Sequence, residues 1–163
     1  MADGQGQPAQ KFNFANATVL MVDASPICLE VAANILMAYG FRKLHRCQDL
    51  EQAAQVLRTN LVHLLLIDPY SYGEKGYGFI KKLRANTNGP NAKTPIIVVA
   101  SYTPVRLITS ARECGADYVV AKPFSTGALL ERILWVASRE GQRSELVSAA
   151  ETVSQEGSGM ELW

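Results

Sequence analysis

Three charged residues, in widely separated parts of the chain, lie at or near the end of short apolar runs. Asp23 ends TVLMVD, Asp68 ends VHLLLID, and Lys122 stands near the end of DYVVAKP. A carboxylate at the mouth of an apolar strand is either a satisfied capping group or a reactive group. Which of the two applies depends on the groups that the fold brings beside it.

The elements that would position these residues follow a regular alternation. Short apolar runs predict β-strands, and segments with apolar residues at helical spacing predict helices between them. Because parallel neighbouring strands need crossover helices, this order predicts an α/β fold with a doubly wound, five-stranded parallel sheet and five helices. The predicted strands are 18–23, 43–47, 62–68, 96–100 and 117–123, and the predicted helices are 26–40, 50–58, 76–85, 103–115 and 125–139.

Capping residues support the predicted helix boundaries. Ser25 followed by Pro26 is typical of a helix start, and Gly40 of a helix end. Asp49, with Gln52 three residues later, fits a capping-box pattern.

The predicted sheet indicates where the three charged residues lie relative to one another. In open α/β sheets the reactive crevice lies at the carboxyl ends of the strands. Asp23, Asp68 and Lys122 end the first, third and fifth strands, so we expect two acids and a lysine to converge there. The competing interpretation is that each is an unrelated polar residue at a loop mouth.

Composition excludes several classes of protein. The chain has 163 residues, enough for one ordinary domain, with 16 basic and 15 acidic side chains, so nothing favours a nucleic-acid partner. The apolar run 61–67 is too short for membrane insertion, and the first residues lack the apolar core of a signal peptide. Three widely spaced cysteines indicate buried thiols in a reducing compartment, which predicts a cytoplasmic protein.

The chain divides into three predicted parts. Residues 1–16 are polar and predict a flexible leader, and residues 17–139 predict the α/β domain. Residues 140–163 form a tail, in which Leu146, Val147, Ala150 and Val153 lie on one side of a possible short helix and which ends GMELW. Disorder is one interpretation of the tail, and a docking peptide is the other. The loop GEKGYG (73–78) lacks the ending of a phosphate-binding loop and predicts a flexible loop.

With these elements in order, residues 17–139 resemble a response-regulator receiver domain of two-component signalling. The residues that carry the resemblance are Asp23 in VDAS, Asp68 in LLIDPY, and Lys122 and Pro123 in VVAKPF. The resemblance implies a flavodoxin-like (β/α)5 fold, Asp68 as phosphoacceptor, Lys122 as its partner and a cis Lys122–Pro123 bond.

The resemblance also implies a cofactor, Mg²⁺, held by Asp23, Asp68 and the backbone carbonyl of Tyr70. It implies no enzyme activity beyond self-phosphorylation on Asp68. Its expected partners are a sensor histidine kinase or phosphotransfer protein and a downstream protein target.

The sequence departs from the family pattern at several positions. The second acid of the usual pair is Ala24, which weakens the expected metal site, and the usual hydroxyl after the fourth strand is Ala100. The aromatic switch position is Val119, and the usual Met-Pro pair is Ser71-Tyr72. A hydrogen bond to a charged group contributes about 1.5–3 kcal/mol. Losing the one hydroxyl therefore removes as much as a typical allosteric coupling, about 1–3 kcal/mol.

Two functions follow as alternatives. The first is a single-domain receiver-like protein that acts through protein contacts, with Asp68 as candidate phosphoacceptor. The second is a phosphorylation-independent pseudo-receiver adaptor in which Lys122 pairs permanently with Asp68 without metal, and which responds to a bound anion such as a cyclic dinucleotide. For either one, the expected partner contacts are aromatic and arginine residues near the last two helices: Tyr102, Arg106, Arg112, Tyr118 and Trp135.

Overall fold

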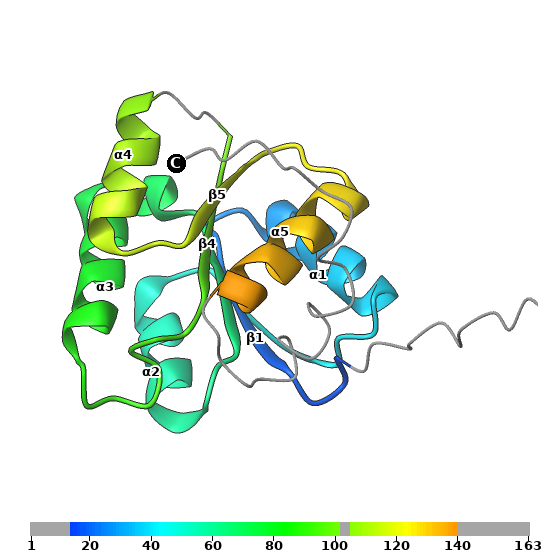
Figure 1. Ribbon diagram of the computed structural model, residues 1–163, viewed down its shortest axis with the longest axis horizontal. Helices are drawn as coiled ribbons and strands as arrows, with labels where there is room; N and C mark the ends of the chain where they lie inside the picture. The colour runs from blue at the N-terminus through cyan, green and yellow to red at the C-terminus, as the bar shows by residue number, and fades with distance from the viewer. Residues whose placement is uncertain (1–13, 102–104, 140–163) are drawn as a thin grey trace, which may run out of the picture.

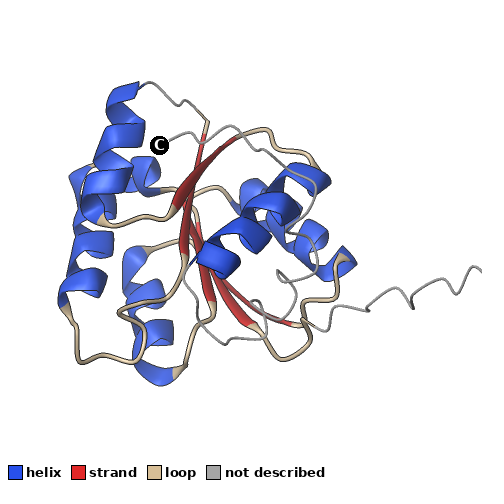
Figure 2. Cartoon of the chain, viewed as in Figure 1, coloured by secondary structure: helices blue, strands red, loops and turns tan. Residues whose placement is uncertain are grey.

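A computed structural model describes residues 14–101 and 105–139. Within them the chain forms one parallel sheet of five strands with the order β2-β1-β3-β4-β5. Helices cover both faces, as Figure 1 and Figure 2 show. The predicted doubly wound α/β fold is confirmed. The strands are β1 (Thr18–Val22), β2 (Lys43–Cys47), β3 (Leu64–Ile67), β4 (Ile96–Ala100) and β5 (Tyr118–Ala121).

The helices divide between the two faces of the sheet. Figure 1 shows α1 and α5 on one side and α2, α3 and α4 on the other. Two buried apolar clusters match this division, one containing side chains of α1 and α5 and the other side chains of α2, α3 and α4. The helices are α1 (Pro26–Ala38), α2 (Leu50–Thr59), α3 (Glu74–Ala85), α4 (Val105–Cys114) and α5 (Thr126–Arg139), with a short 3₁₀ helix, η1 (Pro69–Tyr72), before α3.

The central strands are apolar because both of their faces are covered. Every residue of β3 and of β4 is buried. Leu65 pairs with Ile96 and Ile67 with Val98, so the two strands run parallel toward the same edge of the sheet. This register brings the residues that follow the strands to one edge of the sheet.

The predicted caps are confirmed by hydrogen bonds. The Ser25 hydroxyl oxygen accepts from the Cys28 N–H at 3.3 Å, and an Asp49 carboxylate oxygen accepts from the Gln52 N–H at 2.8 Å. At the start of the helix predicted from residue 125, the Ser125 hydroxyl accepts from the Ala128 N–H in the same way, at 3.1 Å. These bonds satisfy N–H groups that a helix start leaves unpaired.

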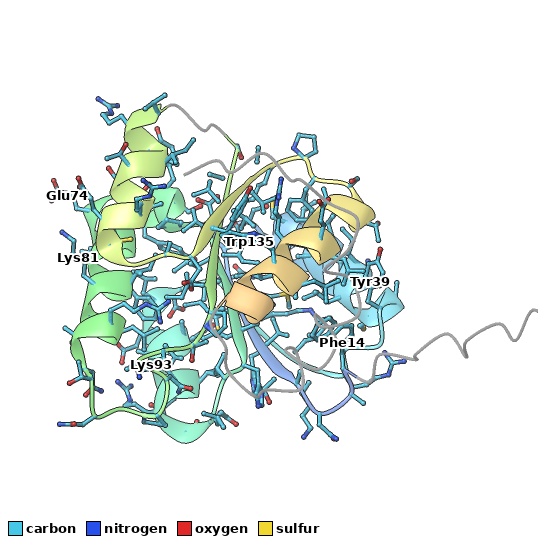
Figure 3. The ribbon with its side chains drawn as sticks, in the orientation of Figure 1. Phe14, Tyr39, Glu74, Lys81, Lys93 and Trp135 are labelled. Carbon is cyan, nitrogen blue, oxygen red and sulfur yellow. The ribbon has the colours of Figure 1, made fainter. Side chains whose placement is uncertain are left out.

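The segment 73–78 is not the flexible loop that we predicted. Glu74 begins α3, two residues before the expected start, and Figure 3 shows Glu74 and Lys81 on the outer side of this helix. Gly73 makes the turn from η1 into α3 with a φ of +61°, a conformation that favours glycine. A Cβ on Gly76 would lie 2.1 Å from the Pro69 carbonyl oxygen, so this glycine allows α3 to pack directly on η1.

The predicted flexible leader is wrong at its C-terminal end. Phe14 is 2% exposed and stacks on Phe41 with 4.3 Å between ring centroids. Figure 3 shows Phe14 close to the end of α1, where Tyr39 also lies. The domain therefore includes residues from Phe14 onward, because one aromatic residue packs into a core that the polar composition of the segment conceals. Residues 1–13 and the predicted tail 140–163 lie outside the described residues.

In the described part of the chain, none of the helices has the length and apolar character needed to cross a bilayer. The three cysteines are unpaired, with Cys47 and Cys114 buried and Cys28 partly exposed.

Candidate functional site

The three charged residues converge at the carboxyl edge of the sheet. The Lys122 Nζ donates to Asp23 Oδ2 at 2.5 Å and to Asp68 Oδ2 at 2.9 Å. The three side chains are 12%, 6% and 7% exposed, respectively. The predicted convergence is confirmed, and the Lys122–Pro123 peptide bond is cis, as the resemblance implied.

Backbone hydrogen bonds that extend the sheet hold these residues in place. The Asp68 N–H donates to the Val22 carbonyl, and the Lys122 N–H donates to the Ala100 carbonyl. The Asp23 N–H donates to the Cys47 carbonyl at 3.1 Å. Each charged side chain thus leaves from a backbone position that a neighbouring strand fixes, which gives the cluster a defined geometry.

The charges in the cluster are unequal, since two carboxylates face one ammonium. Burial alone would lower the pKa of Lys122, but its hydrogen bonds to Asp23 and Asp68 and their negative charges outweigh burial and raise this pKa above its usual value. Lys122 therefore stays charged across the physiological range.

One buried carboxylate oxygen of the cluster accepts no hydrogen bond from the described residues. Asp23 uses both of its oxygens, because Oδ1 accepts from the Ser25 N–H at 2.9 Å. Asp68 Oδ1, by contrast, is buried and has no hydrogen-bond partner among the described residues. A buried unsatisfied oxygen is unfavourable in a structural cluster and marks where a ligand would bind.

The carboxylates of the cluster determine how well the site fits a magnesium ion. Mg²⁺ is commonly held by one or two carboxylates with several waters, so the Asp68 and Asp23 carboxylates form a minimal set. The carbonyl oxygen of Tyr70 already accepts from the Gly73 N–H at 3.3 Å. Among the described residues, no group of three His, Cys, Asp or Glu side chains has a metal-binding arrangement. The residues present therefore fit a weakly held ion.

Tyr72 is a site residue that sequence reasoning missed. Its hydroxyl donates to the Gln48 carbonyl at 2.5 Å and so ties η1 to the loop that follows β2. Burial, followed by the negative charges of Asp23, Asp49 and Asp68, raises the pKa of Tyr72 to about 12. The sequence showed only a departure from the family pattern here, because the partner of the hydroxyl is a backbone carbonyl 24 residues away.

The departures from the family pattern occupy distinct environments. Ala24 is exposed beside Asp23. Ala100 and Val119 are each 1% exposed, and Ala100 pairs with Ala121 at the end of the sheet. A methyl group thus stands on β4 where the family carries a hydroxyl.

The predicted contact residues differ in how exposed their side chains are. Arg106 and Arg112 are exposed on α4. Tyr118 is 1% exposed, so its side chain does not lie on the surface as we expected for a contact residue. Trp135 is half-buried and lies edge-on to Tyr118, with 5.0 Å between ring centroids; Figure 3 shows it on α5 beside β5. Tyr102 lies outside the described residues.

Alternation along β5 explains the error at Tyr118. Its ring points into the cluster of side chains beneath α5, where the Arg132 guanidinium lies 4.5 Å from the ring centroid. Arg132 is therefore an additional cation near the surface of α5 that the sequence pattern did not single out.

Comparison with known proteins assigns residues 19–134 to one family model, the response regulator receiver domain. Two curated relatives agree with it. A probable chemotaxis protein CheY of Rhizobium etli is 28% identical over 107 residues, which cover 66% of this chain and 81% of that protein. The transcriptional regulatory protein YvrH of Bacillus subtilis is 26% identical over 133 residues, which cover 82% of this chain and about half, 54%, of that protein.

Solved structures show the same fold. A response regulator from Thermotoga maritima is 28% identical, with a TM-score of 0.65, and the match covers 74% of this chain and 96% of that one. The chemotaxis protein CheY4 of Vibrio cholerae, at 23% identity, has a TM-score of 0.66 over 74% of this chain and 98% of its own.

Proposed function

Because the chain belongs to the response regulator receiver family of two-component signalling, we propose that it is an adaptor that works through protein contacts, with Asp68 as its phosphoacceptor. Receiver domains are generally signalling modules without enzyme activity on other substrates. The observation that supports the proposal best is the buried cluster of Asp23, Asp68 and Lys122, which has one unsatisfied carboxylate oxygen.

The proposed chemistry takes place at Asp68 Oδ1. This oxygen attacks the phosphorus of a phosphodonor, a new O–P bond forms, and the bond from phosphorus to the leaving group breaks, with its electron pair departing on that group. Lys122 already contacts the other oxygen of Asp68 at 2.9 Å, so its ammonium offsets part of the negative charge that gathers there. Asp23, Asp68 and the Tyr70 carbonyl would hold Mg²⁺, which supplies further neutralisation of charge when bound.

The switch that follows phosphorylation is weakened in this proposal. Ala100 offers no hydroxyl to hydrogen-bond a phosphoryl group, and Val119, at the position of the aromatic switch residue, has no ring that could change its packing. Signalling then depends on the surface of the unphosphorylated domain and on the charge and volume that a phosphoryl group adds at the edge of the sheet.

The second candidate function, a phosphorylation-independent pseudo-receiver, is favoured by one observation. The Lys122 ammonium bonds both carboxylates at once, so the cluster is held together by its own residues. In this function Asp68 is a structural partner of Lys122, and protein binding is constant.

The contact surface that we propose for either function includes α4 and α5. Arg106 and Arg112 are exposed on α4. Arg132, on α5, lies over the ring of Tyr118 in β5. Arginine, tyrosine and tryptophan are enriched among the residues that dominate protein interfaces. The proposed partners are a sensor histidine kinase or phosphotransfer protein and a downstream target protein.

A phosphorylation assay separates the two functions. The protein is incubated with Mg²⁺ and acetyl phosphate, and its intact mass is measured over time. We expect the mass of one phosphoryl group to be added slowly, and to be absent from Asp68→Asn and retained in Asp49→Asn, a nearby carboxylate outside the cluster. If no mass is added at saturating donor, the pseudo-receiver function replaces the phosphoacceptor.

A further inference from the structure

An apolar groove lies beside the charged cluster, on the face of the sheet that α1 and α5 cover. It has a volume of about 450 Å³, within the range of ligand-binding pockets. Its walls come from α1, from the ends of β1, β3 and β4, and from the loop between β5 and α5. The residues used below are Ile27, Cys28, Val31 and Phe124, with Asp23 and Lys122 at the polar end.

The α1 side of the groove exposes two large apolar side chains. Ile27 is 74% exposed and Val31 is 48% exposed, although both lie on the same helix wall. Glu30 is the one charged residue of α1, so little on this helix favours solvation over contact. Exposed apolar patches of this kind on a small domain mark binding surfaces.

The chain itself supplies a segment that can reach the groove. The loop containing Phe124 lies at the groove, and α5 then runs 14 residues, roughly 21 Å, away from it to Arg139. The sequence continues for 24 residues, 140–163, which span at most roughly 80 Å when extended. The return distance is therefore well within reach, and a short tether gives a high effective concentration.

The composition of that segment matches the groove. The residues from Gly157 to Trp163 contain Met160, Leu162 and Trp163 with a single charged side chain, at Glu161. A tryptophan flanked by aliphatic side chains offers the large apolar area that such a groove can bury, and methionine adapts to irregular walls.

We propose that Met160, Leu162 and Trp163 bind in this groove of their own chain, next to its polar end at Lys122 and Asp23. This inference goes beyond the proposed function, because it requires neither phosphorylation nor a metal. A partner that contacts the exposed apolar side chains of α1 must therefore displace the bound segment.

Cys28 provides a direct probe, because its thiol lines the groove and is partly exposed while Cys47 and Cys114 are buried. In the full chain we expect Cys28 to react slowly with a chromogenic disulfide reagent. Deletion of 158–163, or Trp163→Ala alone, should speed its reaction at least about fivefold, since protection scales with the ratio of closed to open states. Cys28→Ser identifies the signal, and Leu61→Ala, an exposed residue away from the groove, is the matched control.

Fluorescence gives an independent measurement. The chain has two tryptophans, so Trp135→Phe leaves Trp163 as the single emitter. Its emission should be shifted to the blue relative to free tryptophan, and Val31→Glu in the same background should shift it to the red. Should Trp135→Phe fail to fold, the labelling experiment carries the test alone.

Two outcomes overturn the proposal. Equal Cys28 labelling rates with and without 158–163 would show that the segment does not occupy the groove. Protection that disappears on dilution would assign the groove to a second copy of the chain, because binding within one chain is independent of concentration.

Discussion

Two polar clusters lie at opposite ends of the sheet, and they are built differently. At the amino end of β4 and β5, the Arg84 side chain donates to the carbonyls of Gly115, Ala92 and Thr94 and to the Asp117 carboxylate, all at 2.8–3.0 Å. At the carboxyl end, Lys122 stands between two carboxylates, one of which keeps an unsatisfied buried oxygen.

The contrast separates a structural cluster from a functional one. Arg84 is paired mostly with backbone carbonyls, and Asp117 Oδ2 also accepts from the Ile96 N–H at 2.7 Å, so the cluster fixes loops between elements. Asn91 has a similar role at the same end, where its side chain binds the backbone of Leu57, Asn60 and Val62. A satisfied network rigidifies a fold, whereas an excess of charge and a free acceptor leave a site able to bind something.

The largest effect is expected at the structural cluster. Arg84→Met removes four hydrogen bonds, one of which is the ion pair to Asp117, so we expect a loss of about 3–5 kcal/mol in the free energy of unfolding. Urea denaturation measures it. Lys82→Met, an exposed change on the same helix, should stay within about 0.5 kcal/mol. An equal loss in the free energy of unfolding for the two variants would contradict the structural role of the Arg84 cluster.

Lys122→Met tests the functional cluster. Two carboxylates then lose their shared cation, and we expect a loss of about 1.5–3 kcal/mol, the range for hydrogen bonds to charged groups. Millimolar Mg²⁺ should restore stability in this variant more than in the native protein, because the ion replaces the missing positive charge. A thermal melt with and without Mg²⁺ measures both. Identical shifts in the two proteins would mean that Lys122 and the metal do not share a site.

Ala24→Asp tests the same cluster by adding a carboxylate instead of removing the cation. A third acid should lower stability without metal, because like charges repel, and should tighten Mg²⁺ binding about tenfold, which corresponds to about 1.4 kcal/mol. Calorimetric titration with Mg²⁺ provides the dissociation constant. Ala24→Asn, which adds nearly the same volume without charge, is the control, and it should not produce the tightening.

The smallest effect is expected at Tyr72. Tyr72→Phe removes the hydrogen bond to Gln48, which costs about 0.5–1.5 kcal/mol. Native Tyr72 keeps its proton to a pKa of about 12, whereas an unfolded tyrosine loses it near 10, so its stabilisation is complete below pH 10 and is lost as the pH rises toward 12. Lys122, with its raised pKa, acts in the same direction. Stability measured from pH 8 to 11 should therefore fall less steeply in Tyr72→Phe than in the native protein.

Local patterns in the sequence determined most of the architecture. Apolar runs, helical spacing and the caps at Ser25, Asp49 and Ser125 act within a few residues, so they indicate the elements directly. The rule that parallel strands end at one edge then brought Asp23, Asp68 and Lys122 together, because it depends on topology and not on details of packing.

Tertiary structure alone decided the features that depend on contacts between distant residues. Phe14 packs on Phe41, Tyr72 bonds Gln48, and Arg84 bonds Gly115, each with a partner that no local pattern indicates. Tyr118 was expected on the surface but is buried for the same reason, because which face of β5 is covered depends on where α5 packs. The apolar groove arises where α1, the ends of the strands and the loop before α5 meet, and only their packing leaves that space open.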